Sequence, residues 1–238
     1  MAYEAGPPHC LELLMTAIDT TIADRVKAAQ PQFAARLPAD VRATFGADLQ
    51  RIVAEGVPAG VAAPGMPMPD GDLLDAFGRP ITLTAVRAGR PAVVVFYRGA
   101  WCPYCNLALH AYQETLVGAL DARGVALVAV SPQKPDGSLS AAEKNGLTFA
   151  VVSDPGNQIA GPLGIVMRHG EGARDAQASL GLDVSERNVD GTHDLPMPTV
   201  VVVDAAGTIR WIDVRPNYAT RSEPGEILAA VDGVLQAG

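Results

Sequence analysis

Two cysteines three residues apart are the residues of this chain best suited to chemistry. Cys102 and Cys105 lie in the segment FYRGAWCPYC, directly after the apolar run Ala92–Tyr97. Apolar residues at helical spacing follow, at Leu109, Tyr112, Leu116 and Leu120. A Cys-x-x-Cys at the start of a helix meets unpaired backbone N–H groups and the positive end of the helix dipole. Both favour the thiolate, which is the reactive form of cysteine. The pattern therefore predicts redox chemistry at sulfur.

The composition limits the class of protein that carries this pair. The chain has 238 residues, of which 48% are apolar, and a net charge of −8. This acidic balance argues against nucleic acid or a membrane surface as a partner, because both attract basic patches. The apolar runs are far shorter than the roughly 20 residues of a membrane-spanning helix, and the first residues do not resemble a signal peptide. Three cysteines do not make a secreted disulfide framework, so we expect a reducing, cytoplasmic location.

An α/β core must hold the cysteine pair in place. Strands are predicted at 92–97, 125–130 and 148–152, and helices at about 103–121, 139–145 and 156–161. Residues 163–195 have weak periodicity and are predicted to form a loop-rich insertion. A strand hairpin, Thr199–Val203 with Thr208–Val214, and a helix over about 223–236 complete the pattern. Strand, helix and strand followed by a hairpin predict an α/β fold whose first two core strands are parallel neighbours.

Two amphipathic helices are predicted before this core. Their apolar stripes are formed by Leu11, Leu14, Ile18, Ile22 and Val26, and by Phe45, Leu49, Ile52 and Val53. Pro31 and Pro38 are expected to separate the two helices, and the stretch 56–71 is expected to be a linker. We therefore divide the chain into a helical extension with its linker, 1–63, and a core domain, 64–238. The stripes could cover the sheet edge or form a homodimer contact, and both interpretations stay open.

The core resembles the thioredoxin superfamily, and within it the peroxiredoxin-like (alkyl hydroperoxide reductase/thiol-specific antioxidant) branch. Peroxiredoxins carry Pro-x-x-x-Thr/Ser-x-x-Cys after a strand ending in Phe-Tyr, and here the three motif positions hold Arg98, Cys102 and Cys105. The Ser153-Asp154 pair and the hairpin 203–210 are also similar. The resemblance covers 64–238. It implies a thioredoxin-like fold, a central mixed sheet flanked by helices, to which the N-terminal helical extension is added.

Further site residues are inferred from this resemblance. Arg221 falls where many peroxiredoxins have an arginine near the active site. The segment Met197-Pro198-Thr199 looks like the cis-proline segment of thioredoxins, which offers its backbone to a substrate, and the tetrad CPYC is that of glutaredoxins. Pro198 and Thr199 are therefore assigned, with Trp101 and Tyr104 beside the cysteines, to the substrate-binding surface. Arg98 and Tyr218 are further candidates to line the pocket, and His110 is interpreted as structural.

Three functions follow from these residues. The resemblance implies a thiol-dependent peroxidase that reduces hydroperoxides and is recycled by a thioredoxin- or glutathione-type donor. Cys105 would then attack the peroxide, Cys102 would resolve the sulfenic acid, and Arg221 would stabilise the thiolate. The alternatives are a disulfide reductase with Cys102 as the nucleophile and a non-catalytic redox sensor. No cofactor or metal is expected, because the chain lacks a dinucleotide fingerprint and neither Cys10 nor the four histidines show ligand spacing.

Overall fold

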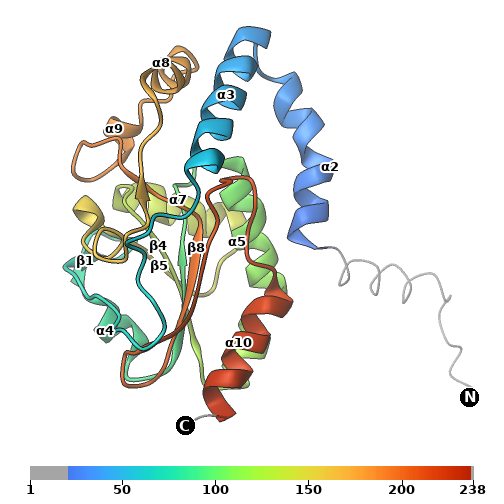
Figure 1. Cartoon of the computed structure of the whole chain (residues 1–238). Helices are drawn as coiled ribbons and strands as arrows, with labels where there is room; N and C mark the ends of the chain where they lie inside the picture. Colours follow the sequence, from blue (N-terminus) through green and yellow to red (C-terminus); the bar gives the residue numbers. More distant parts are fainter. Residues whose placement is uncertain (1–20, 237–238) are drawn as a thin grey trace, which may run out of the picture.

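The computed structural model describes residues 21–236, and a mixed sheet of seven strands lies at its centre (Figure 1). The strand order is β2-β1-β5-β4-β3-β8-β9. The strands are β1 Leu73–Leu74, β2 Pro80–Ile81, β3 Ala92–Phe96, β4 Ala126–Ser131, β5 Ala150–Ser153, β8 Thr199–Val203 and β9 Ile209–Val214. Strands β3, β4 and β5 are parallel, whereas β8 runs antiparallel to β3 and to β9. The short strands β6 (Val166–Met167) and β7 (Leu195–Pro196) form a separate ladder.

Strands β3, β4 and β8 are buried along their whole length. Their sequences are AVVVF, ALVAVS and TVVVV, which are almost entirely apolar, and β3 and β8 are dominated by β-branched residues. Unbroken apolar runs of this kind are typical of strands that are covered on both faces. One face packs against α5 (Pro103–Thr115), α6 (Val117–Asp121), α7 (Pro135–Asn145) and α10 (Pro224–Gln236). The other face packs against α4 (Leu83–Arg87) and the turns around Ile159 and Leu163.

Two helices that precede the sheet in the sequence, and one that follows β6 in the sequence, lie beyond the end of the sheet at which α5 begins (Figure 1). They are α2 (Ile22–Ala35), α3 (Ala39–Glu55) and α8 (Glu171–Ser179). Ile22 and Val26 of α2 are buried in the core that contains α5, and Ile52 of α3 is buried beside Met167. Ile22, Val26 and Ile52 therefore cover this chain's own core, whereas Phe45 and Leu49 are partly buried and Val53 is exposed. Leu11, Leu14, Ile18 and Cys10 lie outside the described residues.

The predicted thioredoxin-like fold, with its central mixed sheet flanked by helices, is confirmed. β3 and β4 are parallel neighbours, and β8 and β9 form the predicted hairpin. The division at residue 63 stays a prediction. The expected linker has no helix or strand between 57 and 72, but its backbone bonds to the sheet, since Gly65 and Met68 donate to the carbonyl oxygens of Ile209 and Gly207.

Several predicted elements were wrong in detail. The helix expected over 103–121 is interrupted at Leu116, after a turn in which the Thr115 hydroxyl donates to the Ala111 carbonyl, a bond that bends helices. The helix expected over 156–161 is only the 3₁₀ turn Pro155–Asn157, because Gly156 and Asn157 have positive φ angles. Pro31 lies inside α2 rather than between the two helices.

The segment 163–195 is also more ordered than predicted. It contains β6, α8, a short helix α9 (Val184–Arg187) and β7. Short elements with Gly between them leave no long apolar periodicity for sequence reasoning to detect. Within residues 21–236, no helix is both long and apolar enough to cross a membrane.

Candidate active site

The two cysteines open helix α5. Cys102 is the N-cap residue, Pro103 occupies the first helical position, and Cys105 lies in the first turn. Proline suits that position because its φ angle is already helical and it lacks an N–H that would otherwise be unpaired. The Cys102 carbonyl accepts hydrogen bonds from the backbone N–H groups of Cys105 and Asn106, both at 3.1 Å. Only 1% of Cys102 and none of Cys105 is exposed, so both sulfurs lie beneath the surface.

Arg221 contacts one of the two sulfurs. Its Nη2 donates to Cys105 Sγ at 3.0 Å, and its Nη1 donates to the carbonyls of Tyr218 and Thr220 at 2.7 and 2.6 Å. The loop that carries Arg221 is tied to α5, because the Tyr112 hydroxyl donates to the carbonyl of Ser222 at 2.8 Å. The guanidinium is therefore buried and held in one orientation, with its charge directed at Cys105.

The surroundings give the two thiols different acidities. Burial raises the pKa of the Cys105 thiol, but the hydrogen bond with Cys102 and the charges of Arg221 and Arg98 hold that pKa well below its usual value. The backbone N–H of Arg98 acts in the same direction. Burial raises the pKa of Cys102, and the adjacent Cys105 raises it further. The arrangement therefore favours a thiolate at Cys105 and a neutral thiol at Cys102.

The loop between β3 and α5 is held in shape by Gln133 and Gly99. Gln133 follows β4, and its side chain accepts from the Ala100 N–H at 2.8 Å and donates to the Tyr97 hydroxyl at 2.7 Å. Gly99 has a φ angle of +152°, and a Cβ atom there would lie 2.4 Å from Nε1 of Trp101. Glycine is therefore needed where the chain turns from the strand towards Cys102.

Arg98, at the position of the motif proline, joins the cysteines to the added helices. Its guanidinium lies over the rings of Tyr218 and Trp101, 4.4 and 5.0 Å from their centroids. Its Nη2 donates to Nε2 of His169, whose Nδ1 bonds to the Asp48 carboxylate on α3. Asp48 also accepts from the N–H of Gly170 at 3.0 Å and from Arg51 at 2.8 Å. A continuous polar chain thus links α3 to the loop before the cysteines.

His169 is neutral in this network. Burial, together with the nearby charge of Arg98, lowers its pKa to about 4, despite the opposing effect of Asp48. Burial tends to raise the pKa of Asp48, but hydrogen bonds from His169, Arg51 and Gly170 lower it below its usual value. A neutral imidazole that accepts from Arg98 at Nε2 must carry its proton on Nδ1, where it donates to the ionised Asp48. This tautomer satisfies both neighbours.

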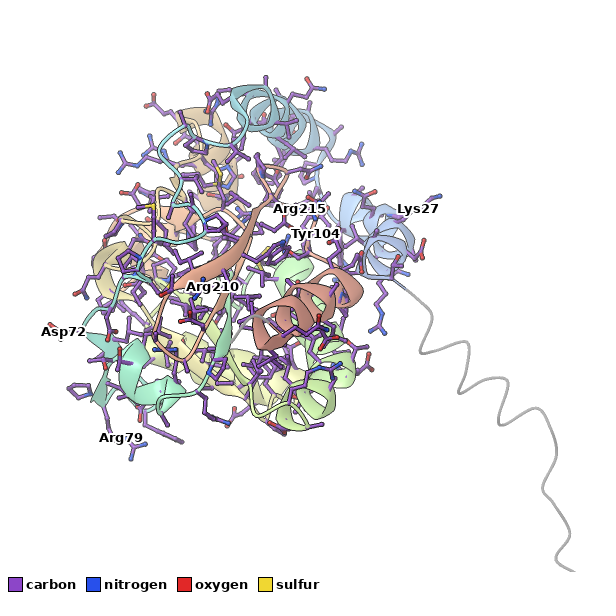
Figure 2. The ribbon with its side chains drawn as sticks, turned by 60° about the horizontal axis from the view of Figure 1, so that its bottom comes forward. Lys27, Asp72, Arg79, Tyr104, Arg210 and Arg215 are labelled. Carbon is purple, nitrogen blue, oxygen red and sulfur yellow. The ribbon has the colours of Figure 1, made fainter. Side chains whose placement is uncertain are left out.

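A cavity of about 820 Å³ lies between these elements, with walls from α2, α3 and the start of α5. Cys102 is part of its wall, as are Trp101, Tyr104, Arg98 and Tyr218, whereas Cys105 is not. Tyr104 lies next to α2 (Figure 2), where its ring meets that of Phe33 edge-on with centroids 5.5 Å apart. The cavity therefore leads to Cys102, and Cys105 lies behind it.

The structure brings most of the proposed site residues together. Arg221 contacts Cys105, and Trp101 and Tyr104 line the cavity with Cys102. Pro198 and Thr199 are buried and do not line it. The expected cis peptide bond at Pro198 was wrong, because no cis bond occurs in residues 21–236. The Pro198 carbonyl instead accepts the Arg215 N–H at 2.8 Å, and Thr199 begins β8, so this segment leads into a strand that is paired on both sides.

Sequence reasoning missed three residues of this site. Gln133 could have been found, because it follows β4 and the carboxyl ends of parallel strands meet at one edge of the sheet. Asp48 and His169 carried no local signal, since they are 121 positions apart and lie outside any motif.

His110 is exposed on α5 and pairs with Glu114 at 3.1 Å. Within the described residues, no three His, Cys, Asp or Glu side chains are grouped so that they could hold a metal ion.

Comparisons with known proteins identify the family of this chain. The model of the AhpC/TSA family matches residues 63–212. A Mycobacterium tuberculosis protein (strain H37Rv) named as a peroxiredoxin is 33% identical over 96 residues, which are 40% of this chain and 60% of that protein. This chain therefore spans about 60% of the length of the curated relatives that it matches.

Solved structures show the same fold at low identity. Peroxidoxin BcpB from Mycobacterium tuberculosis has a TM-score of 0.54 at 17% identity, over 72% of this chain and 97% of that one. The thiol peroxidase from Chromobacterium violaceum has a TM-score of 0.55 at 15% identity, over 75% and 90% of the two chains. These structural similarities show the fold alone. The family model covers most of the sequence and includes both cysteines. The chain belongs to the AhpC/TSA family.

Proposed function

We propose that this chain is a thiol peroxidase in which Cys105 reacts first with a hydroperoxide. The observation that carries this proposal is the contact between Arg221 and Cys105 at 3.0 Å. A fixed cation lowers the pKa of the sulfur that it contacts, and the thiolate is the nucleophile. Within residues 21–236, no cation donates a hydrogen bond to Cys102, and its pKa is raised. The peroxiredoxin and thiol peroxidase names of the relatives and structural neighbours support the same reaction class.

The proposed reaction has two steps at sulfur. The Cys105 thiolate attacks the terminal oxygen of the hydroperoxide, the O–O bond breaks, and the departing alkoxide takes a proton to become an alcohol. Cys105 is then a sulfenic acid. Cys102 loses its proton and attacks that sulfur, and the hydroxyl group leaves as water when the disulfide forms. Sulfur is oxidised by two electrons, and the peroxide is reduced by two.

The same contacts explain why Cys102 would act second. Burial raises the pKa of Cys102, the hydrogen bond and the charge of Cys105 raise it further, and Arg98 and Arg221 lower it. Conversion of the Cys105 thiolate into a neutral sulfenic acid removes the influence of the Cys105 charge, while burial and the two cations remain. The pKa of Cys102 is therefore expected to fall at the moment when its thiolate is needed.

Hydroperoxide consumption and sulfenic acid trapping test this proposal. Wild type, Cys102→Ser and Cys105→Ser are compared in an assay with a recycling thiol and, separately, with a dimedone-type trap. We expect Cys102→Ser to form trapped sulfenic acid rapidly, and Cys105→Ser to form none above the rate of a free thiol. Sulfenic acid on Cys102 in the Cys105→Ser variant, formed as fast as in wild type, would contradict the assignment.

A disulfide reductase is the second candidate, and one observation favours it. Cys102 lines the cavity and Cys105 does not, so an external disulfide would meet Cys102 first. In that reaction the Cys102 thiolate attacks the substrate disulfide, and Cys105 resolves the mixed disulfide. Rapid turnover of a disulfide substrate by wild type, together with no hydroperoxide turnover, would replace the peroxidase with this candidate.

A further inference from the structure

The wall of the cavity carries positively charged side chains, although the chain is acidic overall. The chain has 26 acidic and 18 basic residues. Among residues 21–236, the wall of the cavity nevertheless contains no Asp or Glu, and its charged members are all cationic: Lys27, Arg36, Arg42, Arg98 and Lys144. They come from α2, α3, α7 and the β3–α5 loop. Electrostatics therefore favour an anion in this space.

Most of these cations are not neutralised by any other described residue. Within the part of the chain that the structure describes, Lys27, Arg36 and Lys144 have no ion pair, and Arg42 donates only to the carbonyl of Ala34, at 3.1 Å. Figure 2 shows Lys27 on α2 at the margin of the molecule. Their field is thus available to a molecule that enters the cavity. The rest of the wall combines apolar side chains, such as Phe33, Phe45 and Leu49, with neutral polar ones, such as Gln30 and Gln177.

The cavity also determines which sulfur a reductant can reach. Cys102 forms part of the wall although only 1% of it is exposed, and Cys105 lies behind it against Arg221. A volume of about 820 Å³ is that of a small-molecule site. A protein reductant must bring its own cysteine into contact with the target sulfur, and α2 and α3 stand over this one. A small reductant meets no such obstacle.

We propose that this cavity binds a small thiol bearing carboxylate groups, which reduces the Cys102–Cys105 disulfide by attacking Cys102. The inference rests on the proposed thiol redox function and names the class of its reductant. The thiolate of the small molecule attacks Cys102 Sγ, the Cys102–Cys105 bond breaks, and its electron pair leaves with Cys105 as a thiolate. A second thiolate then attacks the mixed disulfide and releases Cys102, which takes a proton. Two thiols are oxidised to one disulfide while the protein gains two electrons.

The direction of attack agrees with the chemistry of the leaving group. Thiol–disulfide exchange is faster when the departing sulfur is the better-stabilised thiolate. Arg221 contacts Cys105 and has no hydrogen bond to Cys102. Attack at Cys102 therefore expels the sulfur that the protein stabilises most, whereas attack at Cys105 would expel the less stable thiolate.

Single-turnover reduction tests the proposal without any hydroperoxide. The full-length protein is oxidised with diamide, and the loss of its disulfide is followed by quenching and mass spectrometry. The probes are 3-mercaptopropionate, 2-mercaptoethanol and cysteamine, which are anionic, neutral and cationic, and a thioredoxin. Each small-thiol rate is divided by the rate of the same thiol with a small-molecule disulfide, which removes differences in intrinsic reactivity.

We expect the corrected rate of the anionic thiol to exceed that of the cationic thiol by about tenfold or more at low ionic strength, and the ratio to shrink as salt is added. The first mixed disulfide is expected on Cys102 by peptide mapping. Equal corrected rates, a first mixed disulfide on Cys105, or faster reduction by the thioredoxin than by mercaptopropionate at equal concentration would overturn the proposal.

Exposed cations provide variants that are expected to fold. Arg36→Gln with Lys144→Gln should lower the anion-to-cation rate ratio at least about threefold, because two of the five lining charges are removed. Arg79→Gln is the matched control, since Arg79 is exposed, pairs with Asp75 and does not line the cavity. An unchanged rate ratio in the double variant would contradict the proposal that the charges of the cavity attract the anionic thiol. A preference for the anionic thiol without hydroperoxide turnover would overturn the peroxidase proposal and leave this inference standing. Hydroperoxide turnover without that preference would overturn this inference and leave the peroxidase proposal standing.

Discussion

Replacement of Arg221 by glutamine is expected to raise the pKa of Cys105 and slow its reaction with hydroperoxide. The guanidinium donates to Cys105 Sγ at 3.0 Å and is itself buried. Glutamine keeps a polar amide on a shorter side chain and removes the charge. Arg221→Lys keeps the charge, yet a single ammonium group does not reproduce the planar contacts to the sulfur and to the carbonyls of Tyr218 and Thr220. We expect the lysine variant to be intermediate.

The size of the effect follows from the geometry. Two unit charges at 3.0 Å attract by roughly 5 kcal/mol at an effective dielectric constant of about 20. Measured shifts caused by an opposite charge at this range are smaller, about 1–3 pKa units, because desolvation offsets part of the attraction. A higher pKa also makes the remaining thiolate more nucleophilic, and this offsets about 40–50% of the decrease in the logarithm of the rate. The rate of sulfenic acid formation below the pKa should therefore fall by about four- to fortyfold.

The assay measures the pKa and the rate separately. Variants are made in a Cys102→Ser background, so that Cys105 is the reacting sulfur at the site, and the pH dependence of alkylation by iodoacetamide gives the thiolate midpoint. Stopped-flow mixing with hydroperoxide gives the rate of sulfenic acid formation. Arg210→Gln is the matched control, because Arg210 pairs with Asp204 at 2.7 Å on the exposed side of the hairpin.

Two results would refute the reasoning. The alkylation midpoint of a folded Arg221→Gln protein could coincide with that of Arg210→Gln, and the Arg221 charge would then contribute nothing to the acidity of Cys105. The midpoint could instead shift as expected while the hydroperoxide rate stayed constant. Thiolate formation would then not limit the reaction, and the peroxidase proposal would lose its main support.

Two further predictions concern the supports of the site. The pKa of His169 is lowered from 6.5 to about 4, so between these pH values the unfolded chain binds more protons and the fold loses about 3 kcal/mol as the pH decreases. His169→Gln should flatten the pH dependence of urea unfolding in this window, and a slope equal to that of wild type would contradict the prediction. Gly99→Ala should destabilise the fold by about 1–3 kcal/mol and alter Trp101 fluorescence, because the new Cβ atom would lie 2.4 Å from the indole nitrogen. Gly118→Ala, in a helix with open space around it, should be neutral or stabilise by up to about 1 kcal/mol, and an equal loss in both glycine variants would contradict the steric argument.

The order of the core elements could be predicted because each has a local cause. Runs of β-branched residues such as AVVVF form buried strands wherever helices cover both faces, and Asp204 to Gly207 form the turn between β8 and β9 as expected. The Cys-x-x-Cys lies at the start of α5 because Pro103 suits the first helical position. The boundaries that were wrong depended on single side-chain bonds and positive φ angles, which have no periodicity.

The amino-acid pattern alone thus predicts an α/β fold with a cysteine pair at the start of a helix, since both predictions depend on neighbours in sequence, and the family resemblance adds the thioredoxin-like topology. The difference between the two sulfurs is a tertiary property. Arg221 contacts Cys105 across 116 positions, and Asp48 orients His169 across 121. The cationic cavity likewise combines residues from α2, α3, α7 and the β3–α5 loop. No local pattern specifies such contacts, because electrostatic effects depend on distance in space and on burial, and packing alone determines both.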